Sequence, residues 1–176
     1  NINTDDVART WINKLPAGAT FTAERESYIS LLEKMNFDYQ WGGKRDFDLD
    51  TISDNEFNDW IGAQIRIDMY GWVLPGHPEK AAALARKDAS LSHRGCAVEC
   101  SAFLAALAAY IPVCKTRISA IENSLELIDK DSHAYQAVAI GISNSGKSSE
   151  DIIEKYKELS PVHSLNNLAV VCLLYT

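Results

Sequence analysis

Basic residues are too few and too scattered in this sequence to form a binding face for nucleic acid. The chain has 17 Lys and Arg against 24 Asp and Glu, a net charge of −7, and no basic run longer than a pair such as Lys44–Arg45. Binding to a phosphate backbone requires Lys and Arg clustered on one face. We therefore expect no nucleic acid among the partners of this protein.

Cysteines and long apolar runs are also scarce. The spacing of the cysteines fits neither a zinc site nor a C-x-x-C redox pair. Each cysteine sits among apolar neighbours, where it acts as a small hydrophobe, so the pattern predicts reduced thiols and a cytoplasmic location. The longest apolar stretch, 100–114, is shorter than the roughly 18 residues of a membrane span, so no membrane partner is expected. The four cysteines are Cys96, Cys100, Cys114 and Cys172.

The chain lacks a secretory signal peptide and begins with Asn1 rather than Met. From this we expect a fragment or a processed product, incomplete at both ends. Its 176 residues, 47% hydrophobic and 23% charged, can bury the core of a globular protein. We expect residues 1–176 to form a single helical domain that is part of a larger one.

Helical periodicity runs through almost the whole sequence, and no strand pattern is convincing. Thr4, Thr22 and Thr116 are candidate helix caps, Pro78 suits the first position of a helix, and 97–111 is apolar nearly all round, as in a central helix. Residues 36–55 form a polar loop. The pattern predicts an all-α fold, a compact multi-helix bundle, with helices over 4–15, 22–35, 56–73, 78–91, 97–111, 116–128, 133–140, 149–159 and 165–175.

The stretch from Gly141 to Ser148 matches G-x-x-x-x-G-K-[ST], the phosphate-binding P-loop in which Lys147 would neutralise phosphate. A P-loop follows a buried strand, however, and 135–140 is a weak strand candidate. The alternative is a Ser- and Gly-rich loop between two helices. We favour the loop and keep nucleotide binding as the lesser hypothesis.

The stretch Thr4-Asp5-Asp6 also has two interpretations. Adjacent carboxylates beside a hydroxyl could bind Mg²⁺, which prefers oxygen ligands. A hydroxyl followed by two acids is also ordinary chemistry for the start of a helix. Because Trp11 and Leu15 follow at core spacing, we favour the helix start.

A third group of polar residues surrounds the turn at Pro75–Gly76. Arg66 and Asp68 precede the turn, and Asp88, Ser92 and His93 follow it. A buried charge requires a partner, so these side chains could simply fasten helices to one another. They could equally line a ligand-binding cleft, and residue chemistry alone leaves both interpretations open.

The order of these residues resembles the middle portion of the ADP-ribosylglycohydrolase family. The resemblance continues upstream through Asp6, Trp11 and the run 22–25, and downstream through the run 163–167. It is most specific in the segments Trp60-Ile-Gly-Ala-Gln-Ile-Arg-Ile-Asp68, Tyr70-Gly-Trp-Val-Leu-Pro-Gly76, Pro78-Glu79 and Asp88-Ala-Ser-Leu-Ser-His93.

The resemblance implies an all-helical hydrolase that uses two Mg²⁺ ions to cleave the glycosidic bond between ADP-ribose and an acceptor. The family's metal ligands come from an early Thr-Asp-Asp-Thr motif and a late Asp-Thr-Asp motif. Thr4-Asp5-Asp6-Val7 lacks the final Thr, and no Asp-Thr-Asp occurs, so we assign no metal ligand and no catalytic residue in this chain. The partner implied is ADP-ribose or an ADP-ribosylated target.

The same resemblance implies that Arg66, Asp68, Asp88, Ser92, His93 and Asn167 bind the ligand. We expect His93 near the start of the 97–111 helix, at the mouth of a cleft shared with a helix that carries Arg66. Ala97 and Val98 depart from the family pattern, and a branched side chain takes up space that a close backbone contact needs. A non-catalytic helical module that binds ADP-ribose or another partner without metal is therefore the alternative.

Overall fold

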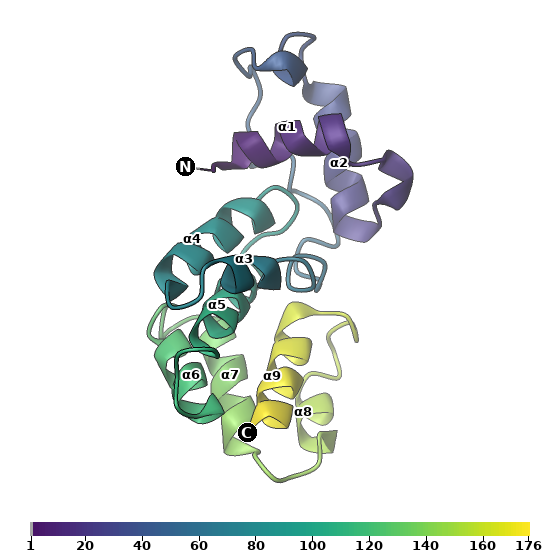
Figure 1. The fold of residues 1–176 in the computed structure, drawn as a ribbon. Coiled ribbons are helices and arrows are strands. Elements are labelled where there is room, and N and C mark those ends of the chain that lie inside the picture. Colours follow the sequence, from purple (N-terminus) through teal and green to yellow (C-terminus); the bar gives the residue numbers. More distant parts are fainter. Residues whose placement is uncertain (1) are drawn as a thin grey trace.

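The computed structural model describes residues 2–176 and confirms the all-α fold class (Figure 1). In this part of the chain the only β-type pairing is an isolated antiparallel bridge between Trp60 and His163. No helix within it is both long enough and apolar enough to span a lipid bilayer. Its helices are α1 (Thr4–Lys14), η1 (Ala17–Ala19), α2 (Thr22–Lys34), η2 (Tyr39–Trp41), α3 (Asp68–Val73), α4 (Pro78–Ala89), α5 (Cys96–Tyr110), α6 (Arg117–Leu125), α7 (His133–Ser143), α8 (Glu150–Lys155) and α9 (Ser164–Tyr175), where η marks a short 3-10 helix.

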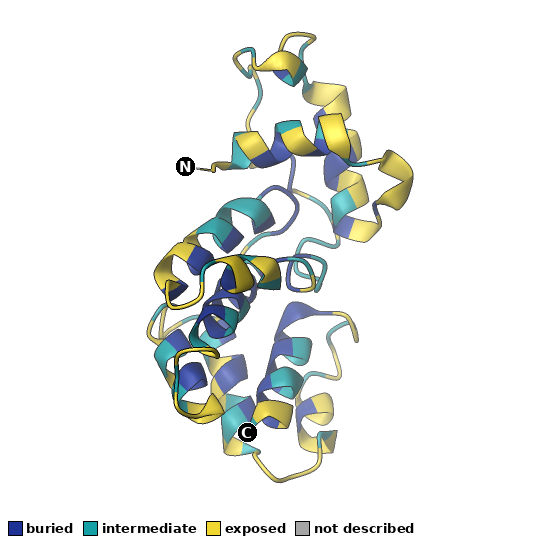
Figure 2. Ribbon diagram, in the orientation of Figure 1, coloured by how far each residue is buried: buried dark blue, intermediate teal, exposed yellow. Residues whose placement is uncertain are grey.

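Helix α5 is central, as its uniformly apolar sequence predicts. It contacts α3, α4, α6, α7 and α9 and is buried over most of its length (Figures 1 and 2). The small side chains of its alanines let neighbouring helices approach closely. At Gly71 of α3, an added Cβ would collide with the Cβ of Ala108 and lie 2.6 Å from the Ala105 carbonyl oxygen. Gly71 is therefore required by the close contact between α3 and α5.

The N-terminal helices form a second apolar cluster, separate from the one around α5. Helices α1 and α2 pack there with the polar loop, whose Leu49 and Ile52 are buried, and with Leu91 from the end of α4 (Figure 2). Figure 1 shows this part at one end of an elongated molecule, with α8 and α9 at the other end. Five of the six residues predicted to bind ligand belong to the segments between these ends, whereas Asn167 belongs to α9.

The predicted cap at Thr116 is confirmed, because its side chain accepts from the Ser119 amide, but the predicted caps at Thr4 and Thr22 are wrong by one residue. Asn3, not Thr4, caps α1, because its side chain accepts from the Asp6 amide at 2.9 Å while Asp6 accepts from the Asn3 amide at 2.8 Å. Thr22 is already inside α2, and the preceding Phe21 offers no side-chain cap. Pro78, by contrast, begins α4 as predicted.

The predicted helix over 56–73 is present only from Asp68, and the residues before it form successive turns. Their backbone groups are used by distant segments: the Ile61 amide donates to Val162, and the Asn58 carbonyl accepts from Arg94. Such bonds compete with the helical ladder and hold this segment in turns. Arg66 consequently lies outside any helix, which corrects the sequence-based expectation.

The P-loop hypothesis is wrong. The segment from Gly141 to Ser143 belongs to α7, and within residues 2–176 no strand precedes it. Helical backbone directs its amides along the helix axis and cannot wrap around a phosphate as a P-loop does. Gly141 has a packing role instead, since an added Cβ would lie 2.5 Å from the Ala169 carbonyl oxygen and 2.6 Å from the Cβ of Cys172 in α9.

Candidate functional site

Arg66 is the centre of an ion-pair network that joins several parts of the chain. Its guanidinium pairs with Glu24 of α2 and with Asp88 of α4, where Nε lies 2.9 Å from Oδ1. Nη2 donates to the Ser92 hydroxyl at 3.0 Å, and the guanidinium carbon lies 5.3 Å from the centre of the Trp11 ring. Burial of these charges is tolerable because each has a partner. Arg66 therefore fastens α1, α2 and α4 to the turns before α3.

The two carboxylates of this network have different surroundings. Asp88 accepts a second hydrogen bond from the Tyr70 hydroxyl at 2.8 Å, and burial together with Asp88 raises the pKa of Tyr70, so the phenol remains a donor. Burial raises the pKa of Glu24 above its usual value, and the Arg66 charge only partly opposes this effect. The ionised form of Glu24 is therefore favoured by its ion pair with Arg66.

His93 is buried next to the network and is neutral. Its Nε2 accepts from the Ala63 amide at 3.3 Å, so the ring proton is on Nδ1, which lies 2.8 Å from the Ser92 oxygen and donates to it. Burial of the ring, followed by the nearby Arg66 charge, lowers the pKa of His93 to about 3. Both ring nitrogens thus have protein partners.

The low pKa of His93 predicts a specific dependence of stability on pH. The unfolded chain binds a proton at His93 below about pH 6.5, whereas the folded chain does not until about pH 3. This contribution to stability is therefore present above pH 6.5 and is lost as the pH falls, by up to about 1.4 kcal/mol per pH unit. Urea unfolding between pH 6 and pH 4 should show a steeper loss for the wild type than for His93→Gln. Parallel profiles would contradict the prediction.

The predicted ligand-binding residues do not line one cleft. His93 lines an open polar pocket, whereas Arg66 lines a different, aromatic pocket. Asp68 and Asn167 line a third pocket between α3, α5 and α9. His93 lies close to the start of α5, as predicted. The prediction that His93 and Arg66 share one cleft is corrected, because the two residues line different pockets. Asp88 and Ser92 lie in the Arg66 network, and ligand contact by any of the six residues stays a prediction.

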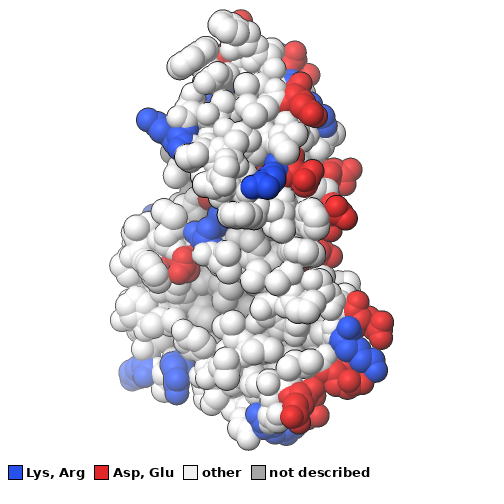
Figure 3. Space-filling view, turned by 90° about the vertical axis from the view of Figure 1, so that its right-hand side faces the viewer, with Lys and Arg blue, Asp and Glu red and all other residues white. Residues whose placement is uncertain are grey.

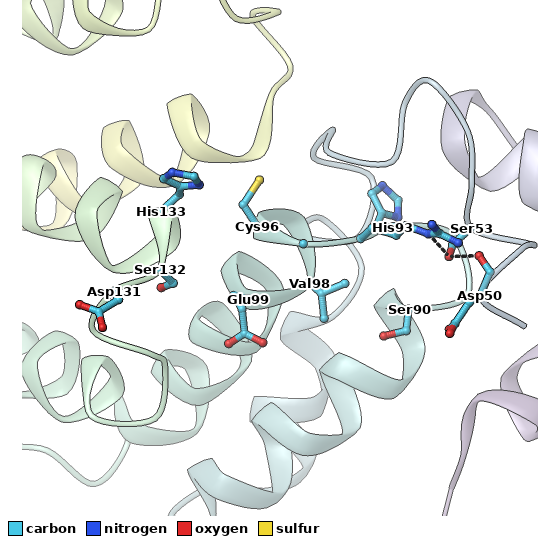
Figure 4. A pocket seen from close by; sticks show the side chains of 12 residues that line it. Asp50, Ser53, Ser90, His93, Cys96, Val98, Glu99, Asp131, Ser132 and His133 are labelled. Carbon is cyan, nitrogen blue, oxygen red and sulfur yellow. Dashed lines mark hydrogen bonds between the residues drawn. The ribbon is translucent and has the colours of Figure 1, made fainter.

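The polar pocket, of about 660 Å³, opens at the N-terminus of α5. Figure 4 shows His93, Ser53 and Asp50 on one side and His133 and Asp131 on the other. We call it the helix-end pocket; its lining is Asp50, Ser53, Ser90, His93, Arg94, Gly95, Cys96, Val98, Glu99, Asp131, Ser132 and His133.

Gly95 and Arg94 shape the entrance to this pocket. Gly95 has φ 51° and ψ −122°, a conformation that a side chain disfavours, and no side chain caps the helix that follows. Arg94 donates from Nε to the Ser53 hydroxyl at 3.0 Å, and its Nη1 lies 3.7 Å from the exposed Asp54. Arg94 and the first turn of α5 therefore meet at one opening, a combination that can bind an anion. The Ala97 amide already donates to the Arg94 carbonyl at 3.2 Å, and the carboxylates of Asp50 and Asp131 line the same pocket.

A comparison with models of protein families shows which family the chain belongs to. The family model described as ADP-ribosylglycohydrolase matches residues 2–176, essentially the whole chain. The chain belongs to the ADP-ribosylglycohydrolase family. No curated protein and no solved structure matches it.

Asp5 and Asp6, the two adjacent acids considered as Mg²⁺ ligands, have other partners in the structure. Asp6 closes the cap of α1, and Asp5 accepts from the Tyr39 hydroxyl at 2.8 Å and lies 3.4 Å from Arg45. Within residues 2–176, no three His, Cys, Asp or Glu side chains form a group that could hold a metal ion. The residues described here do not fit a Mg²⁺ site, and we assign them no metal chemistry.

Sequence reasoning missed several residues of the helix-end pocket. Asp50 and Ser53 belong to the polar loop, and Asp131 and His133 lie more than 70 residues further along the chain. Only tertiary packing brings these segments together. Ser90 lies inside the recognised run that ends at His93, and Arg94 directly follows it, so the sequence positions of these two residues could have indicated them.

Proposed function

We propose that this ADP-ribosylglycohydrolase-family chain binds the ADP-ribose portion of an ADP-ribosylated target in the helix-end pocket. The complete protein would hydrolyse the glycosidic bond to the acceptor. The four cysteines are free thiols, which suits a cytoplasmic location.

The observation that carries the proposal is the open N-terminus of α5. In a helix of 15 residues the first-turn amides have no partners within the helix, and at Gly95 no side chain replaces them. Pyrophosphate oxygens are suitable acceptors for such amides. Arg94 adds a positive charge at the same opening, and the pocket of about 660 Å³ is in the size range of ligand sites.

A non-catalytic module that binds ADP-ribose without metal is the second candidate. The observation in its favour is that both adjacent acids already have partners: Asp5 accepts a hydrogen bond from the Tyr39 hydroxyl, and Asp6 forms part of the cap of α1. The expected Mg²⁺ would supply Lewis-acid chemistry in a hydrolase of this family. The two candidates therefore differ in whether Mg²⁺ changes binding.

Titration calorimetry with ADP-ribose, with and without Mg²⁺, tests both candidates. Mg²⁺-dependent binding, together with release of ADP-ribose from an ADP-ribosylated polypeptide, is expected of the hydrolase. Binding that is indifferent to Mg²⁺, without release, would favour the module. Absence of binding in both titrations would contradict the proposed site.

Arg94→Ala should weaken ADP-ribose binding about tenfold, because a charge-assisted hydrogen bond to a phosphate oxygen is lost. Its ion pair with Asp54 is exposed, and its hydrogen bond to the Ser53 hydroxyl contributes only about 1 kcal/mol, so the variant should still fold. Arg25→Ala is the matched control, since the Arg25 guanidinium lies over the Phe21 ring at 5.3 Å and is outside the helix-end pocket. Equal affinities of the two variants, measured by calorimetry, would exclude Arg94 from the binding site.

A further inference from the structure

The aromatic pocket lies apart from the helix-end pocket and has no role in the proposed function. It measures about 520 Å³, within the range of sites for small organic ligands. Helix α1, the start of α2, the turns before α3 and the segment before α9 all contribute to it. Its lining is Trp11, Leu15, Ala19, Thr20, Phe21, Thr22, Glu24, Trp60, Ile61, Gly62, Ile65, Arg66 and Val162.

The pocket walls are aromatic and aliphatic, and parts of them are exposed to water. Phe21 is 66% exposed and Ile65 is 72% exposed, while Trp11 is nearly buried. Covering apolar surface is favourable by about 25 cal/mol per Å². Aromatic rings add attraction for another ring in offset or edge-to-face contact. Figure 3 shows that acidic side chains on one face of the molecule gather along one edge, whereas the lower centre of that face is largely uncharged. These walls suit a flat, uncharged ring.

Glu24 and Arg66 give the pocket a polar element, and together with Asp88 their network holds two carboxylates and one guanidinium. Arg66 has five N–H groups, and four of them already donate, to Asp88 (side chain and carbonyl), Glu24 and Ser92. The Glu24 carboxylate can accept several hydrogen bonds and receives one from a side chain, that of Arg66. The unused hydrogen-bonding capacity is therefore mostly that of an acceptor, and it suits a ligand with an N–H donor.

Backbone strain lies at the same place. Thr22 has φ 45° and is the only non-glycine residue in 2–176 with a positive φ. Such conformations cost energy and tend to cluster where ligands bind. Thr22 lines the aromatic pocket, so the strain supports a binding role for it.

We propose that the aromatic pocket binds a small, neutral, planar heteroaromatic molecule that carries an N–H donor. The ring stacks against the Trp11, Phe21 and Trp60 side chains, and the N–H donates to Glu24. This site does not depend on ADP-ribose binding in the helix-end pocket.

Indole is the probe, and benzofuran, in which oxygen replaces the N–H, is its matched control. NMR titrations would follow the indole N–H signals of Trp11 and Trp60. Indole should bind about tenfold more tightly than benzofuran, because only indole can donate to a carboxylate. Phe21→Ala should weaken indole binding about fivefold. Phe37→Ala should leave it unchanged, since Phe37 is 86% exposed and outside the pocket.

Three results would overturn the proposal. The first is no shift of the Trp11 and Trp60 signals at millimolar indole, and the second is equal affinity for indole and benzofuran. The third is equal weakening by Phe21→Ala and Phe37→Ala. In a competition arm, saturating ADP-ribose should leave bound indole in place. Displacement of indole would overturn the separate site and assign the pocket to ADP-ribose instead, whereas failure of ADP-ribose to bind would contradict only the proposed function.

Discussion

Arg66→Ala should lower the free energy of unfolding by about 3–5 kcal/mol. The substitution removes the guanidinium and leaves two carboxylates, Glu24 and Asp88, with only 16% and 13% of their side chains exposed. An unpaired buried charge costs far more than the ion pair contributes. The substitution also removes the contact with the Trp11 ring and a donor to Ser92. Urea unfolding followed by circular dichroism measures the loss.

The acid dependence of this loss identifies its cause. Burial already raises the pKa of Glu24, so without Arg66 the carboxyl should be protonated more readily and the penalty should be smaller at pH 4.5 than at pH 7. Arg94→Ala is the control, because its ion-pair partner Asp54 is 73% exposed and exposed pairs contribute about 0–1 kcal/mol. Loss of its hydrogen bond to the Ser53 hydroxyl adds only about 1 kcal/mol. If both variants lost the same stability, the Arg66 network would not hold the helices together.

Gly71→Ala should destabilise the protein by about 2–3 kcal/mol, although alanine is the better helix former. The added Cβ would collide with the Cβ of Ala108 and lie 2.6 and 2.7 Å from the backbone of Ala105 and Ala109. Backbone atoms of a central helix cannot rotate away, so α3 must move off α5. Thermal and urea unfolding would both detect the change.

Gly18→Ala is the matched control for the substitution in α3. Gly18 has no positive φ, and an added Cβ there meets no atom within 4 Å. Its stability should change by less than about 1 kcal/mol. Equal effects of the two substitutions would show that loss of glycine flexibility, rather than contact between helices, determines the result.

Local sequence patterns predicted the helices well where side-chain burial alone determines the structure. The apolar run at 97–111 identified α5, and Pro78 marked the first residue of α4. The prediction failed at 56–67 because the Ile61 amide and the Asn58 carbonyl bond to partners about 100 and 36 residues away in sequence. No local periodicity records such partners.

The candidate site was predictable in its chemistry but only partly in its geometry. Arg66, Asp88, Ser92 and His93 were recognised from the sequence, and the structure joins them through hydrogen bonds. The pocket that each of these side chains faces could not be predicted, because it depends on the conformation of the turns before α3. Asp68 illustrates this, since two positions along the chain separate it from Arg66 and yet it lines a different pocket.

The separation of the N-terminal apolar cluster from the one around α5 has a consequence for how the chain opens. Cooperative units that share few contacts can unfold independently of each other. Leu91 is the one buried residue from α4 and its C-terminal turn in the N-terminal cluster. The remaining connection is mainly polar: the Arg66 ion pairs and hydrogen bonds such as those from Thr4 to Lys87 and from Asn55 to Ser92. In native-state hydrogen exchange, amides of α1 and α2 should therefore exchange through a sub-global opening, at a lower free energy than those of α5. A ligand that contacts both α1 and the turns before α3 would raise the free energy of this opening without altering the core around α5.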